Sequence, residues 1–333
     1  NSVVLTGAPM WLTPKGLYKS VKPWNEMIPL TIAEEIRATL LDYLTTTFSF
    51  QDQAVEQALL DFFAPQQPGN TSEGLFKGPY ISLRLPFRKA DPDAEIPLEI
   101  SPAFTPYAHQ MRAFERLSTY NGRQPQPTLI TTGTGSGKTE CFLYPILDYC
   151  YAHRGEPGIK AIILYPMNAL ATDQAGRLAH LLAADERLNG QIIAAMYISG
   201  EGEQRHSTMR PDHLIDDRDT LRKRPPDILL TNYRMLDFLL LRPEDKTLWA
   251  ENAPETLRFL VLDELHTYDG AQGSDLACLI RRLKARLNIP DGVLCPVGTS
   301  ATVASDLGNT RQFLTDYAEQ IFGVAFAPDS VIG

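Results

Sequence analysis

The chain has 333 residues, of which 44% are hydrophobic, so it is long enough for one large or two modest domains with a real core. Its longest apolar runs, such as residues 238–241, are far too short to cross a membrane. The four cysteines are scattered without a C-x-x-C pair, which argues against a metal or disulfide framework and fits a reduced, cytoplasmic location. The net charge of −9 argues against a tight, stand-alone nucleic-acid binder, because such domains are usually basic.

Residues 1–100 are predicted to form an α-rich accessory region with one or two strands. Thr31-Ile32-Ala33-Glu34 is a capping box that begins one helix, and residues 51–63 carry the apolar spacing of a second helix. Residues 78–86 alternate like a strand, and the Pro- and Asp-rich stretch 90–102 is predicted to be a linker. We favour a packing module that covers the following domain over an element that recruits a partner or loads DNA.

A glycine-rich loop follows the short, β-prone segment 128–131 and precedes a helix with an apolar face at 142–150. In this context backbone N–H groups cradle phosphates, and the helix N-terminus adds positive potential. Lys138 would reach the β- and γ-phosphates of a nucleotide, and the Thr139 hydroxyl would hold Mg²⁺. The strict pattern begins with Gly where this chain has Thr132, and the alternative is a structural Gly-rich turn. The predicted phosphate-binding residues are Thr132, Gly133, Thr134, Gly135, Ser136, Gly137, Lys138 and Thr139.

Strands alternate with helices over residues 101–333. Continuous apolar runs predict a mostly parallel sheet covered by helices on both faces. The segment 201–227 mixes charges without an apolar period, so we expect a solvated, mobile insertion, with a loop that touches nucleic acid as the alternative. The predicted strands are 129–131, 161–165, 192–197, 227–230, 259–262 and 293–297.

An acidic pair, Asp263-Glu264, ends the buried strand at 259–262. In a parallel α/β sheet the ligand lies beyond the carboxyl ends of the strands, so this pair would face the phosphates. Asp263 would then hold Mg²⁺ and Glu264 would polarise the attacking water. The alternative is an acidic pair that only complements a helix dipole.

Further motifs accompany the loop and the acidic pair in a fixed order, and together they resemble superfamily 2 helicases of the DEAD/DEAH type. The resemblance covers residues 104–303. One branch looks closest, that of large bacterial helicases similar to the mitomycin-repair and RecQ-four-like helicases and to helicase subunits of the phage-defence systems Druantia and DISARM. The motifs are Phe104-Thr105-Pro106-Tyr107-Ala108-His109-Gln110, Tyr165-Pro166-Met167-Asn168-Ala169-Leu170, Thr231-Asn232-Tyr233-Arg234-Met235-Leu236, Asp263-Glu264-Leu265-His266 and Gly298-Thr299-Ser300-Ala301-Thr302.

The resemblance implies a RecA-like P-loop domain, ATP and Mg²⁺ as cofactors, and roles for residues beyond the loop. Gln110 would read the adenine edge, with Tyr107 or Phe104 stacked on the base. Residues that follow strand ends would contact the backbone of a single strand, although turn and capping chemistry explains them equally well without it. Those residues are Pro166, Asn168, Gly200, Thr231 and Asn232. Coupling of hydrolysis to strand movement would fall to His266, Ser300 and Thr302.

The activity implied is ATP-dependent movement along nucleic acid, with DNA a better fit than RNA and a role in DNA repair or anti-phage defence. An RNA helicase and a non-enzymatic, nucleotide-dependent scaffold are the alternatives. A second RecA-like domain, expected beyond residue 333, would supply an arginine finger. The piece of chain up to residue 333 is therefore expected to hydrolyse ATP weakly or not at all by itself. Other expected partners are subunits of a defence or repair complex.

Overall fold

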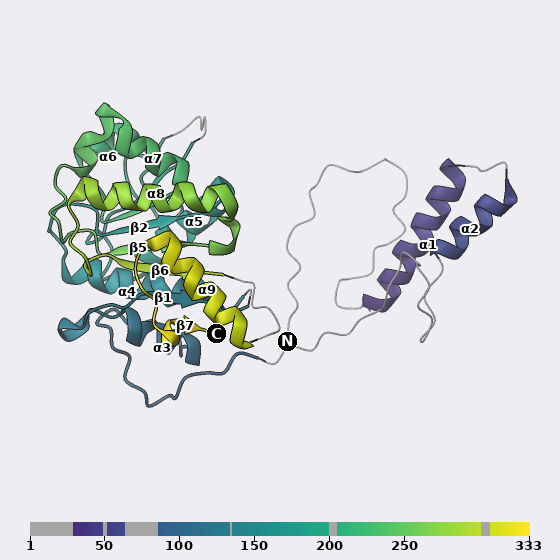
Figure 1. Cartoon of the computed structure of the whole chain (residues 1–333), viewed down its shortest axis with the longest axis horizontal. Coiled ribbons are helices and arrows are strands. Elements are labelled where there is room, and N and C mark those ends of the chain that lie inside the picture. The colour runs from purple at the N-terminus through teal and green to yellow at the C-terminus, as the bar shows by residue number, and fades with distance from the viewer. Residues whose placement is uncertain (1–28, 49–51, 64–85, 134, 200–204, 301–306) are drawn as a thin grey trace. The chain divides into compact units, whose positions relative to one another are not determined.

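The computed structural model describes residues 29–48, 52–63, 86–133, 135–199, 205–300 and 307–333. The chain divides into two units, Asn1–Leu85 and Pro86–Gly333 (Figure 1). In the first unit, helices α1 (Pro29–Thr47) and α2 (Gln53–Phe63) agree with the two helices predicted there. The strand predicted at 78–86 lies outside the described residues except for its last position. Among the described helices none is long and apolar enough to span a membrane.

The second unit contains a seven-stranded sheet in the order β3-β4-β2-β5-β6-β1-β7, and every pair of neighbouring strands is parallel. This confirms the predicted parallel α/β fold. Each of the six predicted strands is present, with ends shifted by up to two residues. The strands are β1 (Thr128–Ile130), β2 (Ala161–Leu164), β3 (Ala194–Tyr197), β4 (Ile228–Thr231), β5 (Phe259–Leu262), β6 (Cys295–Thr299) and β7 (Val331–Ile332).

The sheet is buried on both faces because its strands are apolar at consecutive positions. In β5, Phe259 and Val261 pack into one core cluster, whereas Leu260 and Leu262 pack into the other. The first cluster includes residues of α3 (Ala108–Leu117), α4 (Lys138–Ala152) and α5 (Asn168–Ala184). The second includes residues of α7 (Tyr233–Leu241), α8 (Gly270–Leu287) and α9 (Leu307–Phe322). Figure 1 shows helices on either side of the strands, which makes three layers.

The segment before β4 differs from the mobile insertion that we expected. Ile215 forms a parallel bridge with Ala195 of β3, and the Met196 amide donates to the Ile215 carbonyl over 2.9 Å. Leu214 and Leu221 are buried, and Leu221 lies in the short helix α6 (Arg218–Lys223). The described part of this segment is therefore packed on the sheet edge, and the prediction failed because two or three apolar residues suffice to anchor a short segment.

The stretch expected to be a linker also packs on the second unit. Ala90 and Leu98 join Met111 and Phe114 of α3 in a small apolar cluster. The Ile100 amide donates to the buried Asp148 carboxylate of α4 over 2.7 Å. The division between the units thus follows Leu85, whereas the sequence placed a boundary near residue 100.

Candidate functional site

The glycine-rich loop that is predicted to bind phosphate, which we term the phosphate loop, joins β1 to α4, and its conformation depends on glycine. Gly135 and Gly137 have φ angles of +79° and +77°, which side chains other than glycine rarely adopt. Gly137 is the N-cap of α4, so the helix begins at Lys138, and the predicted helix after the loop is present. The Thr132 and Ser136 hydroxyls lie 2.6 Å apart and form a hydrogen bond across the loop. Thr134, also predicted to bind phosphate, lies outside the described residues.

Lys138 and Glu264 face each other across the site. Lys138 Nζ lies 3.5 Å from Glu264 Oε1, although the two residues are far apart in sequence. Lys138 Nζ and Glu264 Oε2 are buried and make no hydrogen bond. A buried ammonium and a buried carboxylate oxygen without hydrogen bonds are costly in a folded protein. The pattern is typical of a site whose charged groups are reserved for a ligand.

Asp263 and Glu264 are held in place by Thr299, the last residue of β6. Thr299 Oγ1 donates to Asp263 Oδ1 and accepts from the Glu264 amide over 3.1 Å. Burial raises the pKa of the Asp263 carboxyl, and the hydrogen bond from Thr299 lowers it. The negative charge of Glu264 raises this pKa further, whereas the positive charge of Lys138 lowers it. Glu264 has a left-handed φ of 50°, which turns the chain sharply after β5. The sequence placed Thr299 in the motif Gly298–Thr302 but predicted no function for it.

His266 lies next to the motif that ends β6. Its Nδ1 is 3.1 Å from the Ser300 hydroxyl and 3.4 Å from Glu264 Oε2. The structure therefore brings together two of the three residues predicted to couple hydrolysis to movement. The third, Thr302, lies outside the described residues.

Gln110 has its side-chain amide engaged on both sides. Its Oε1 accepts from the Tyr107 amide over 2.9 Å, and its Nε2 donates to the Gly137 carbonyl over 3.1 Å. The residue is 2% exposed. The amide oxygen can accept one more hydrogen bond, and the amide nitrogen can donate one more. Recognition of an adenine edge by Gln110 therefore stays a prediction.

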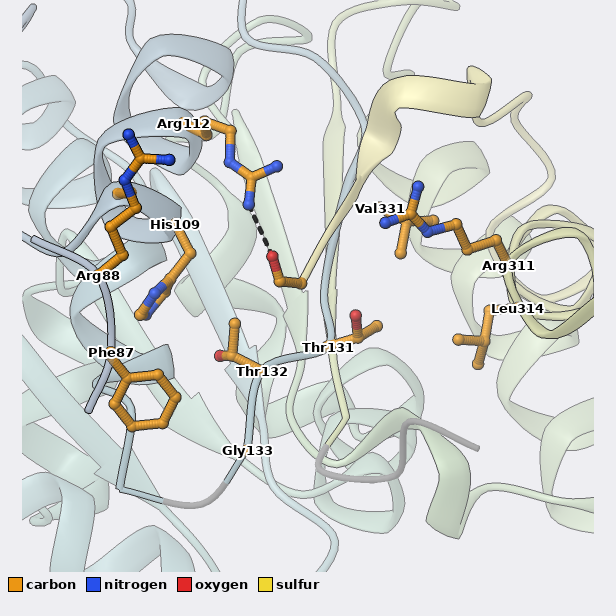
Figure 2. Close-up of a pocket in the computed structure, with 12 residues that line it drawn as sticks. Phe87, Arg88, His109, Arg112, Thr131, Thr132, Gly133, Arg311, Leu314 and Val331 are labelled. Carbon is orange, nitrogen blue, oxygen red and sulfur yellow. Dashed lines mark hydrogen bonds between the residues drawn. The ribbon is translucent and has the colours of Figure 1, made fainter. Parts of the chain in front are cut away.

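A pocket of about 750 Å³ opens beside the first half of the phosphate loop (Figure 2). Neither Tyr107 nor Phe104 lines it: Tyr107 stacks on His109 at 5.6 Å, and Phe104 packs edge-on against Tyr144. The aromatic residue in the lining is Phe87, which precedes every motif and which the sequence gave no reason to select. The lining also includes Arg88, His109, Arg112, Thr131, Thr132, Gly133, Arg311, Leu314, Val331 and Gly333.

The residues predicted to contact a strand gather at the carboxyl ends of β2, β3 and β4. Asn168 donates to the Ser199 carbonyl over 2.7 Å, and Asn232 donates to Asn168 Oδ1 over 2.7 Å. Asn232 Oδ1 also caps α7 by accepting from the Met235 amide over 2.8 Å. Thr231 is fully buried and donates its hydroxyl to the Tyr197 carbonyl.

Two further residues complete the predicted strand-contact set. Pro166 is half-buried at the same edge, and Gly200 lies outside the described residues. The structure thus joins Asn168 and Asn232 by a hydrogen bond, whereas the buried Thr231 bonds to the end of β3.

The site offers few side-chain oxygens to a Mg²⁺ ion. Among the described residues no cluster of three or more His, Cys, Asp or Glu side chains could hold a metal by itself. Mg²⁺ at phosphate-transfer sites typically takes one or two protein oxygens and keeps waters and substrate phosphates as its other ligands. Thr139 in the first turn of α4 and Asp263 at the end of β5 fit that sparse requirement.

Comparisons with known proteins agree with this geometry. The family model described as DEAD/DEAH box helicase matches residues 107–310. Druantia protein DruE of Escherichia coli (strain UMEA 4076-1) is 29% identical, over 70% of this chain and 18% of its own length. The uncharacterized ATP-dependent helicase YprA of Bacillus subtilis is 33% identical, over 60% of this chain and 23% of its own length.

Among solved structures, the DUF1998 helicase MrfA bound to DNA and AMPPNP is similar to this chain. It matches with a TM-score of 0.51 and 26% identity, over 74% of this chain and 30% of that chain. The chain therefore spans less than a third of the length of each of these three relatives.

Proposed function

Because the chain belongs to the DEAD/DEAH box helicase family, we propose that it is the ATP-binding part of a helicase or translocase that moves along a nucleic-acid strand, with DNA as the substrate. One observation carries the proposal. Lys138 Nζ and a Glu264 oxygen lie 3.5 Å apart at the carboxyl edge of the sheet, and the site leaves both residues with a buried polar atom that makes no hydrogen bond. In such a pair the lysine can bind a polyphosphate and the carboxylate can orient an attacking water.

Each residue of the site has a distinct task in this proposal. Lys138 neutralises charge on the terminal phosphate, and the loop amides that precede it hold the phosphate oxygens. Glu264 orients the attacking water and accepts its proton. Thr139 and Asp263 would hold Mg²⁺, which when bound neutralises phosphate charge. Thr299 positions the Asp263 carboxylate and the backbone of Glu264, since its hydroxyl bonds to both.

Strand binding is proposed for the opposite half of the same sheet edge. Asn168 and Asn232 form a hydrogen-bonded pair at the N-termini of α5 and α7, where amide groups and short polar side chains suit phosphate contacts. DNA is favoured because MrfA has been solved bound to DNA. Anti-phage defence is favoured over other pathways by the similarity to Druantia protein DruE, with repair as the alternative.

A strand-stimulation assay on the full-length protein tests the proposal. ATP hydrolysis is measured without nucleic acid, with single-stranded DNA and with single-stranded RNA of the same sequence. We expect stimulation by DNA that exceeds stimulation by RNA. Stimulation by RNA alone would indicate an RNA helicase, and ATP binding without hydrolysis under all three conditions would indicate a scaffold.

A further inference from the structure

Two side chains at the start of α3 reach the carbonyl groups of the phosphate loop. His109 Nε2 lies 2.9 Å from the Ser136 carbonyl oxygen, and Gln110 Nε2 donates to the Gly137 carbonyl over 3.1 Å. When successive loop amides face an anion, the carbonyls between them face the protein interior. Buried carbonyls need donors, and these two come from a helix that precedes the loop in sequence.

The hydrogen bond from His109 has a defined direction. A carbonyl oxygen only accepts, so Nε2 must carry the proton and donate it. The imidazole is 5% exposed, lies parallel to the Tyr107 ring at 5.6 Å and meets the Phe87 ring at a steep angle, also at 5.6 Å. Burial lowers the pKa of His109, whereas the hydrogen bond to the Ser136 carbonyl raises it. The positive charge of Arg112 lowers this pKa further. The packing therefore fixes the ring and its donor against one carbonyl.

We infer that His109 is a positioning residue for the phosphate loop: its Nε2–H holds the Ser136 carbonyl inward, which keeps the loop amides directed at the phosphates. The inference rests on the proposed ATP binding. His109 also lines the pocket beside the loop, so a direct contact with the nucleotide base is the competing role. The two roles differ in the part of the nucleotide that they affect.

Binding of two probes to the full-length protein separates these roles. ATP contains a base, whereas inorganic tripolyphosphate offers the loop only phosphates, and both are titrated with Mg²⁺. His109→Gln and His109→Met have nearly the same shape, but only glutamine supplies an N–H donor. His109→Phe keeps the ring and removes the donor. The matched control is His153→Met, because His153 also contacts a backbone carbonyl, that of Tyr149 at 2.9 Å, and packs on the Tyr149 ring at the far end of α4.

We expect His109→Met and His109→Phe to weaken ATP and tripolyphosphate equally, by about tenfold, because a buried carbonyl loses its donor. His109→Gln should recover most of this loss, and His153→Met should bind both probes like the wild type. Thermal melts check that the variants are folded.

Weakening of ATP alone would assign His109 to the base and overturn the inference. Equal behaviour of the glutamine and methionine variants would overturn it too, because only one of them has a donor. If the wild-type protein binds neither probe, the proposed function itself fails, and that result is visible before any variant is compared.

Discussion

The side chains assigned to phosphate chemistry and to strand binding lie on two halves of one sheet edge, and they differ in their hydrogen bonds. At the ends of β1, β5 and β6, which we term the charged edge, Lys138 and Glu264 keep buried polar atoms without hydrogen bonds. At the ends of β2, β3 and β4, the neutral edge, Asn168, Thr231 and Asn232 all bond to other protein groups. Buried polar atoms without hydrogen bonds are costly even within an ion pair, so a protein keeps them where a charged ligand compensates.

This difference predicts how substitutions at each edge affect activity. Removal of a group from the charged edge should abolish chemistry, since no neighbour replaces the charge. Removal of a group from the neutral edge should lower affinity by an amount typical of a few hydrogen bonds. Four variants of the full-length protein test this difference.

Lys138→Ala should reduce kcat/KM for ATP by more than about 10³-fold. The variant loses the charge that binds the terminal phosphate and stabilises it during transfer, and a single such group typically contributes about 10²–10³ in rate before binding is considered. Steady-state ATPase kinetics measure the effect, with the exposed Lys223→Ala as the control. A kcat above about a tenth of the wild-type value would show that Lys138 does not carry this role.

Glu264→Gln should reduce kcat by about 10²–10³-fold while ATP binding stays close to that of the wild type. The amide keeps the shape of the carboxylate but cannot accept a proton, and general-base catalysis typically contributes this much. Single-turnover hydrolysis and equilibrium nucleotide binding separate the two effects, with the exposed Glu244→Gln as the control. If nucleotide binding falls as far as in Lys138→Ala, Glu264 is structural and the charged edge has only one functional group.

Asn168→Ala combined with Asn232→Ala should weaken single-strand binding by about tenfold, because two polar contacts and their mutual bond are lost. ATPase activity in the absence of a strand should hardly change. Fluorescence anisotropy with a labelled oligonucleotide measures the affinity, and the exposed Asn189→Ala is the control. Equal losses of strand binding and basal ATPase would indicate a folding defect and would contradict the separation of the two edges.

Gln110→Ala should relax the preference for ATP over GTP by a few-fold, roughly the contribution of one hydrogen bond. Competition of GTP against ATP is measured in the wild type, in the variant and in the exposed control Gln191→Ala. An unchanged ratio, together with weaker binding of both nucleotides, would mean that Gln110 only braces the Gly137 carbonyl.

Much of the charged edge could be read from the sequence because its chemistry is local. A phosphate loop needs glycines at fixed spacing, and Gly135 and Gly137 do adopt left-handed backbone conformations. Asp263 and Glu264 could be placed because they directly follow a continuous apolar run. Thr299 was not assigned, since its hydroxyl bonds to Asp263 and Glu264, which follow another strand and are distant along the sequence.

Other parts of the molecule could not be predicted for related reasons. Strand β7, which pairs with β1 at the edge of the sheet, has two residues and is therefore too short to carry a pattern of its own. Phe87 precedes the motifs and reaches the pocket only because residues 90–100 pack on α3 and α4. The segment before β4 looked solvated because few of its residues are apolar.

The sequence by itself determined the glycine-dependent turn of the loop before α4 and which strands are buried, because backbone conformation at glycine and apolar runs are properties of neighbouring residues. Only the tertiary structure decided the order of the strands, the 3.5 Å approach of Lys138 to Glu264 and the donors that the Ser136 and Gly137 carbonyls receive from α3. These depend on contacts between segments far apart along the chain. Their energies come from the packing of whole helices on the sheet, and no short motif encodes them.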